Sequence, residues 1–263
     1  MSYGAIIGDV AGSIYEWKPI KTKDINLFKA NCKYTDDSVC TAAVADILLS
    51  DHLPSASEML RQWCRSHPGK GYGGNFRKWI HNPNMGAYRS YGNGAAMRVS
   101  PAAYLNQKEP LEKALEACDL VTNITHNHPE GVRGARATTH AIWLALNGEK
   151  SEDIRKIIED TYYYCLSRTV DQIRPKYSFN VTCQGSVSEA IICALESESF
   201  EDAILNAISL GGDADTQAAI AGSIAEALHG GIVDDLITQV KKFLSPDMIE
   251  IMKKLYSTIH TLS

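Results

Sequence analysis

Helical periodicity runs through most of the 263-residue chain and restricts its fold more than any other feature. Apolar residues recur every three to four positions, as they do on the buried face of a helix. The segments with this pattern are 41–49, 56–66, 110–120, 130–147, 152–166, 187–195, 200–210, 216–229, 233–244 and 247–260. Strand-like alternation is weak and confined to 176–183, which we interpret as a loop or a short strand. The pattern predicts an all-α fold, and we expect a single domain over residues 1–263.

The stretch 69–101 departs from the helical pattern and is rich in glycine and aromatic residues. A long non-repetitive loop in a compact domain is often functional. Within YGNGAAMR, at 91–98, glycines would let backbone N–H groups approach a diphosphate, and Arg98 would add positive charge. The alternative is an ordinary Asn-Gly turn with Arg98 in a surface salt bridge. Four aromatic residues are candidates either for stacking on adenine or for the core: Tyr72, Phe76, Tyr88 and Tyr91.

Composition excludes several classes of protein. Hydrophobic residues make up 44% of the chain and charged residues 22%, as in soluble globular proteins. A net charge of −5 argues against non-specific nucleic-acid binding, because no basic excess displaces counterions. The start of the chain has no signal-peptide pattern, no apolar run is long enough to span a bilayer, and seven scattered cysteines form no CxxC pair. We therefore expect a cytoplasmic monomer with reduced core thiols and no membrane partner.

Two acidic clusters each open a helical segment that is rich in small residues. Thr35, Asp36 and Asp37 form the first, and GGDADT at 211–216 forms the second. Either cluster alone fits an N-cap with acids that complement the helix dipole. Together, four carboxylates and two hydroxyls form a ligand set that Mg²⁺ or Mn²⁺ prefers, and two cations would offset the repulsion. A third acidic segment, GDVAGSIYEW, contains Asp9, which is either an outer group of such a site or a structural cap.

Small residues recur at helical spacing in two segments of the chain. Gly4, Gly8 and Gly12 recur every four residues and would form one smooth stripe, and 218–225 has a similar face at Ala218, Gly222 and Ala225. Helices with such faces can approach each other closely. This packing would bring acids from distant parts of the chain together.

Five motifs in this order resemble the ADP-ribosylglycohydrolase family: GAIIGDVAGSIYEW, YTDDS, GNGAAMRVSP, ITHNHPEGVRGA and GGDADTQAAIAG. They span residues from about 4 to 231. The resemblance implies a compact orthogonal multi-helix domain with a dinuclear Mg²⁺ or Mn²⁺ centre in a cleft. It implies that the metal ligands are Thr35, Asp36, Asp37, Asp213, Asp215 and Thr216. It implies that ADP-ribose is bound by Gly92, Asn93, Gly94, Ala95, Met97 and His126. Ser38 stands where many members have a second threonine.

The reaction implied by the resemblance is hydrolysis of the bond between the ribose anomeric carbon and an acceptor. Two metal ions would grip the ribose hydroxyls and position a water, and a carboxylate would activate that water or guide a proton. Glu16 is the first candidate for this carboxylate and Asp36 the second. The expected substrate is an ADP-ribosylated protein, with arginine as the default acceptor, or a small ADP-ribose conjugate, and the product is ADP-ribose.

Other acceptors and other functions remain open at this point. Serine-linked and nucleic-acid-linked ADP-ribose are alternative substrates, because loops form the acceptor pocket and their shape cannot be read from one sequence. A metal-dependent phosphoester hydrolase would use the same ligands and release phosphate instead. A non-catalytic ADP-ribose-binding or structural protein is the third hypothesis, and the intact acidic clusters argue against it.

Overall fold

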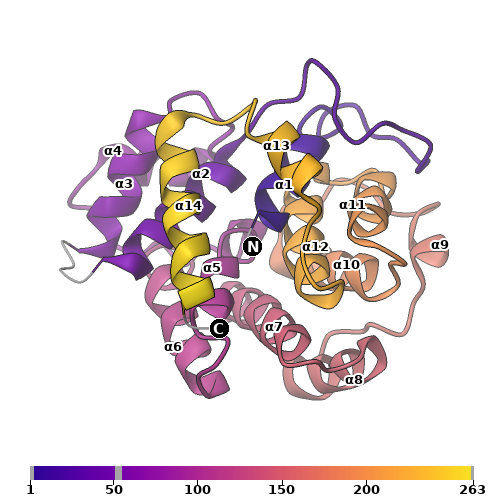
Figure 1. Cartoon of the computed structure of the whole chain (residues 1–263). Coiled ribbons are helices and arrows are strands. Elements are labelled where there is room, and N and C mark those ends of the chain that lie inside the picture. Colours follow the sequence, from indigo (N-terminus) through magenta and orange to yellow (C-terminus); the bar gives the residue numbers. More distant parts are fainter. Residues whose placement is uncertain (1–2, 51–54, 262–263) are drawn as a thin grey trace.

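The computed structural model describes residues 3–50 and 55–261, and its regular elements are helices (Figure 1). They are α1 (Gly4–Gly12), α2 (Asp36–Leu49), α3 (Ala56–Ser66), α4 (Gly74–His81), the 3₁₀ turn η1 (Asn93–Ala95), α5 (Ser100–Leu105), α6 (Leu111–Thr122), α7 (Pro129–Leu146), α8 (Ser151–Tyr162), α9 (Val170–Ile173), α10 (Cys183–Leu195), α11 (Phe200–Ser209), α12 (Ala214–Leu228), α13 (Asp234–Val240) and α14 (Pro246–Thr261). The predicted all-α class is confirmed. The 176–183 segment forms no strand: Thr182 makes an isolated antiparallel bridge with Gly92, and Cys183 begins α10.

Helix α1 packs along α12 in the interior of the molecule (Figure 1), and every residue of α1 is buried. A Cβ atom built on Gly8 would lie 2.0 Å from the main-chain oxygen of Ala218, and one on Gly4 would lie 2.3 Å from that of Gly222. Such distances leave no room for a side chain, so the helices approach backbone to backbone. The glycine stripe expected from the sequence is therefore the contact face of α1.

Two helices begin or end at other residues than the apolar periodicity predicts, because capping and backbone conformation set these ends. Helix α2 begins at Asp36, five residues before the apolar pattern at 41–49, because the side chain of the N-cap Thr35 accepts a hydrogen bond from the Asp37 N–H. Helix α8 ends at Tyr162 instead of continuing to 166, because Tyr163 adopts the left-handed conformation with φ 58°. Apolar spacing carries little information about such caps.

We expected the stretch 69–101 to be one long loop because of its glycines. The structure instead has α4, η1 and the start of α5 there. In α4, Phe76, Trp79 and Ile80 share one buried face, and the rings of Phe76 and Trp79 stack 5.5 Å apart. This burial explains how a segment of only eight residues next to several glycines forms a helix. Apart from η1, the segment between α4 and α5 is irregular, and it passes the functional cleft described below.

The cysteines bear out the expectation of core thiols. All seven are free, and six are buried, whereas Cys165 is exposed. None of the helices in residues 3–50 and 55–261 has both the length and the apolar character needed to cross a membrane.

Candidate metal centre and its cleft

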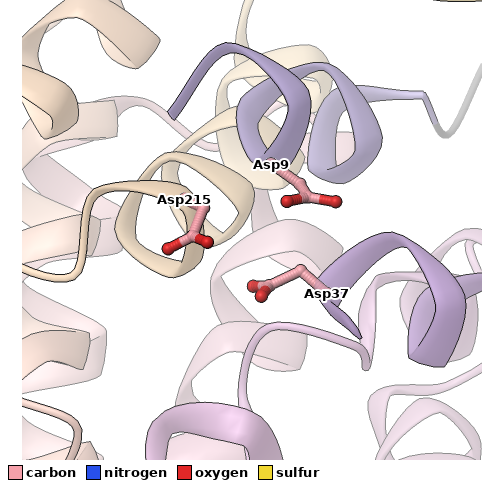
Figure 2. A group of neighbouring side chains, drawn as sticks. All are labelled: Asp9, Asp37 and Asp215. Atoms are coloured by element: carbon pink, nitrogen blue, oxygen red, sulfur yellow. The ribbon is translucent and has the colours of Figure 1, made fainter. Parts of the chain in front are cut away.

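Acids from three distant helices meet at one point in the structure. Asp9 in the body of α1, Asp37 in the first turn of α2 and Asp215 in the first turn of α12 direct their carboxylates toward one another (Figure 2). Oxygen atoms of these three side chains lie within 4.8 Å of one another. Glu16 and Asp213 form a second group with Asp215 at the same spacing. Two groups that share one carboxylate have the arrangement expected for two neighbouring cation positions.

Hydrogen bonds hold the carboxylates in place but leave acceptor capacity free. The Thr35 hydroxyl donates to Asp9 Oδ1 at 2.6 Å, and the Thr216 hydroxyl donates to Asp37 Oδ2 at 3.3 Å. The Asn93 side-chain amide donates to Asp213 Oδ2 at 2.7 Å. Asp37 Oδ1 is buried and has no hydrogen-bond partner. An all-oxygen donor set with an orphaned buried acceptor fits a hard divalent cation such as Mg²⁺ or Mn²⁺.

Burial and mutual repulsion raise the carboxyl pKa values across the cluster. Burial is the main cause for Asp37 and Asp215, whose pKa values rise well above the usual range, and neighbouring carboxylates add to the rise. Burial, followed by neighbouring acids, raises the pKa of Asp36 to about 8 and that of Glu16 to about 7. Without a proton or a cation, the ionised cluster therefore destabilises the folded protein.

The crowding of buried carboxylates predicts that the stability of the metal-free protein depends on pH and that divalent cations remove this dependence. In EDTA, the free energy of unfolding is expected to fall as pH rises from ~6.5 to ~8.5. A carboxyl whose pKa is raised by folding stabilises the fold while protonated, and this stabilisation is lost as pH passes the folded pKa. Asp36 and Glu16 titrate in this window. Buried His126 and His140 have lowered pKa values, so both are already neutral there.

Urea denaturation at each pH, in EDTA and in Mg²⁺, measures this effect. Mg²⁺ is expected to flatten the decline, because the cation binds the ionised carboxylates of the folded state. Equal slopes with and without the cation would contradict a metal centre at these acids.

The sequence left open whether Asp9 belongs to the site or is a structural cap. Its Oδ2 accepts hydrogen bonds from the backbone N–H groups of Thr35, at 2.9 Å, and Ser38, at 3.1 Å. It therefore caps α2, and it also belongs to the first carboxylate group. Its signal in the sequence was its place beside Gly8, on the helix that approaches α12 most closely. Asp36, in contrast, lies outside both three-carboxylate groups and lines the neighbouring cleft.

The acids open into a cleft of about 600 Å³. Of the residues that the resemblance assigned to ADP-ribose, Gly92, Asn93, Gly94, Met97 and His126 line this cleft. Ala95 does not: it is fully buried, and its N–H donates to the Gly92 carbonyl within the η1 turn. A contact between Ala95 and a ligand in the cleft is therefore not supported, since both its side chain and its N–H are occupied inside the loop.

A buried arginine and a neutral histidine stand beside the glycine loop. Arg98 is 1% exposed and donates through Nη2 to the Val121 carbonyl and the Thr125 hydroxyl, so the alternative of a surface salt bridge is wrong. The His126 Nδ1 lies 2.7 Å from the Thr125 hydroxyl, while burial and the Arg98 charge keep the histidine pKa well below its usual value. His126 Nε2 would lie 3.4 Å from a Cβ on Gly94, so this nitrogen faces the loop.

Aromatic residues line the remaining wall of the cleft. Phe76, Tyr88 and Tyr91 contribute to it. Tyr72 lies in the core instead, where its hydroxyl donates to the His67 carbonyl. Three aromatic rings, the glycine loop and the buried Arg98 side chain thus line one cleft together with the acid cluster.

Comparison with known proteins finds relatives over most of the chain. The sequence model of the ADP-ribosylglycohydrolase family matches residues 1–262. The chain is 27% identical over 258 residues to ADP-ribosylarginine hydrolase Tri1 of Pseudomonas putida (strain GB-1), covering 86% of this chain and 69% of the relative. It is 24% identical over 307 residues to ADP-ribosylhydrolase ARH3 of Homo sapiens, covering 86% and 84%. It is 27% identical over 220 residues to the ADP-ribosyl-[dinitrogen reductase] glycohydrolase of Rhodospirillum rubrum, covering 77% and 70%.

A solved structure shares the fold. It is described as an ADP-ribosylglycohydrolase-related protein complex, and it superposes with a TM-score of 0.71 over 97% of this chain and 95% of its own. Because only 21% of the sequence is identical, this likeness bears on the fold alone.

Proposed function

Because this chain belongs to the ADP-ribosylglycohydrolase family, we propose that it is a divalent-metal-dependent hydrolase that removes ADP-ribose from a modified acceptor. One observation carries the proposal: two carboxylate groups that share Asp215 open into the same cleft as the Gly92–Gly94 loop. The relatives described above are named for removal of ADP-ribose, from arginine in one case and from dinitrogen reductase in another.

Two Mg²⁺ ions, or Mn²⁺ in their place, are the proposed cofactors. Asp9 and Asp37 would hold one ion and Glu16 and Asp213 the other, with Asp215 available to both. The hydroxyls of Thr35 and Thr216 and the carboxylate of Asp36 complete the proposed ligand set. When bound, such ions supply the positive charge that orients ribose hydroxyls and lowers the pKa of a water.

The other residues of the cleft have proposed roles in binding. The backbone of the Gly92–Gly94 loop approaches the diphosphate without steric hindrance, and buried Arg98 adds positive potential there. Neutral His126 offers Nε2 to a ribose or phosphate oxygen. Tyr88 and Phe76 offer ring faces to the adenine.

Glu16 is the proposed acid–base group. It lines the cleft and is half-buried, and in the metal-free protein burial and neighbouring acids raise its pKa to about 7. A carboxylate at this position can take a proton from the attacking water or guide one to the acceptor. Asp36 lines the same cleft and is the second candidate. Water would add to the anomeric carbon as the bond to the acceptor breaks, and the proton would go to the departing acceptor nitrogen or oxygen. Arginine is the proposed acceptor.

Release of free ADP-ribose from an arginine-ADP-ribosylated protein, in Mg²⁺, Mn²⁺ and EDTA, tests this function. The expected result is release in either metal and none in EDTA. Free phosphate is measured in the same samples, because its release without ADP-ribose would indicate a phosphoester hydrolase instead. Release from a serine-linked conjugate alone would keep the reaction but overturn the arginine acceptor. No release from any conjugate would overturn the proposed activity.

A further inference from the structure

A second hollow, of about 480 Å³, adjoins the metal cleft. Residues 13–15, 17, 18 and 20 line it together with residues 29, 31 and 33, and we define it as the basic groove by Lys18, Lys29, Lys33, Tyr15 and Trp17. The segment that carries Glu16 separates the two hollows. Glu16 itself lines the cleft, whereas its neighbours Tyr15 and Trp17 line the basic groove.

The charge of the basic groove is opposite to that of the whole chain. Its three lysines are exposed, and no acidic side chain is among the described residues that line it. Within residues 3–50 and 55–261, none of the three forms an ion pair within 4.0 Å. Lys29 instead lies 5.3 Å from the centre of the Tyr15 ring. In a chain with a net charge of −5, this is a local positive potential that attracts an anionic partner.

The walls of the basic groove are fixed to the end of α1. The Lys33 N–H donates to the Ser13 hydroxyl at 3.1 Å, and that hydroxyl donates to the Val10 carbonyl at 2.8 Å. The Lys18 N–H donates to the Tyr15 carbonyl at 3.2 Å. The basic groove therefore exists before any partner binds, which lowers the entropic cost of binding.

An exposed aromatic pair forms the boundary between the basic groove and the cleft. The Trp17 side chain is 75% exposed, yet its ring stacks on Phe179, which is 42% exposed, with centroids 5.2 Å apart. Phe179 lies two residues before Val181, which lines the cleft and is itself exposed. A polymer attached to a ligand in the cleft would pass over this apolar pair on its way to the lysines. Exposed apolar groups clustered at the rim of a site are typical of a binding surface.

We propose that the basic groove and the Trp17–Phe179 pair bind an acidic segment of polypeptide next to the ADP-ribosylated residue. This inference rests on the proposed function, and it adds a preference for the sequence around the acceptor. Carboxylate side chains would pair with Lys18 and Lys29, while Trp17 offers a large rigid contact at low entropic cost. A protein partner is favoured over nucleic acid because three lysines on a chain of net charge −5 are few for a phosphate backbone.

Three synthetic peptides test the preference, each with one ADP-ribosylated arginine flanked by glutamates, serines or lysines. The wild-type protein is expected to cleave the glutamate peptide with a kcat/KM ~2–30-fold above that of the serine peptide, mainly through a lower KM. In K18Q/K29Q this preference is expected to disappear, while the kcat/KM for the small conjugate ADP-ribosylarginine stays unchanged. K108Q/K156Q, two exposed lysines outside the basic groove, is the matched control and should keep the preference.

Equal cleavage of the glutamate and serine peptides by the wild type would overturn the proposal, as would a preference that persists in K18Q/K29Q. An ADP-ribosylated oligonucleotide tests the alternative that the basic groove binds nucleic acid. If K18Q/K29Q impairs cleavage of the oligonucleotide but not of the glutamate peptide, the groove binds nucleic acid and the proposal is wrong.

A binding measurement separates this inference from the proposed function. An unmodified glutamate-rich peptide is titrated while indole fluorescence is recorded, since exposed Trp17 should respond to a ligand on its face. The signal is expected in the wild type and absent in W17F, and peptide affinity should weaken in K18Q/K29Q. If no conjugate is hydrolysed, the proposed function is wrong, but this titration still shows whether the basic groove binds an acidic peptide. Absence of peptide binding by fluorescence and by calorimetry would overturn the proposed role of the basic groove and leave the proposed function untouched.

Discussion

Replacement of Asp215 by asparagine is expected to lower ADP-ribose release by ~10³-fold or more while raising the stability of the metal-free protein. Asp215 belongs to both carboxylate groups, so the change removes a charged ligand from each proposed cation position. The side chain keeps its size. Since burial and neighbouring acids raise the pKa of Asp215, its ionised form is costly in the fold, and a neutral amide relieves that cost.

The measurements are turnover in Mg²⁺, Mg²⁺ affinity by calorimetry and thermal unfolding in EDTA. D160N is the matched control, because Asp160 is an exposed acid at the end of α8 and undergoes the same chemical change. It should leave all three quantities unchanged. Near-normal turnover in D215N would refute the metal assignment. Lost turnover together with lower stability in EDTA would indicate that Asp215 has a structural role instead.

Replacement of Gly8 by alanine is expected to cost ~3 kcal/mol or more of folding free energy. The new Cβ would lie 2.0 Å from the Ala218 carbonyl oxygen and 2.3 Å from its carbon. These are backbone atoms within α12, so no side-chain rotation relieves the clash, and α1 must move away. Because Asp9 follows Gly8 and faces Asp215, the same movement should weaken Mg²⁺ binding.

Urea denaturation and Mg²⁺ titration of G8A measure both effects. G74A is the control, since a Cβ on Gly74 meets nothing within 4 Å and the residue opens α4. Alanine there should leave stability unchanged or raise it slightly. Unchanged stability in G8A would show that the two helices are not held as close as the structure places them.

Local sequence patterns predicted much of the fold because they depend on near neighbours. Helix 56–66 was predicted with its observed bounds, because its apolar residues repeat at helical spacing and bury one face. The glycine stripe of α1 was also visible, since residues at i and i+4 share a face in any helix. The acid clusters were visible as an excess of like charge that a cap alone does not require.

Features that depend on distant parts of the chain were not visible. Phe76, Trp79 and Ile80 of α4 do have helical spacing, but a repeat of about one turn among glycines is too short to predict a helix without knowing that these side chains are buried. Arg98 was ambiguous because its burial depends on the Val121 and Thr125 acceptors, more than twenty residues away. The positive charge of the basic groove could be recognised only from the structure, which places Lys29 and Lys33 beside Trp17.

The sequence by itself determined that this chain is helical, that it belongs to one family, and that its acids are too crowded for capping alone. Only the tertiary structure decided which acids meet, because the distance between Asp9, Asp37 and Asp215 depends on how closely α1 approaches α12. The sequence also could not show that Asp36 stands outside both three-carboxylate groups while Asp9 stands inside one. Adjacent residues on a helix point about 100° apart, so only the position of the helix in space decides which carboxylate reaches the shared site.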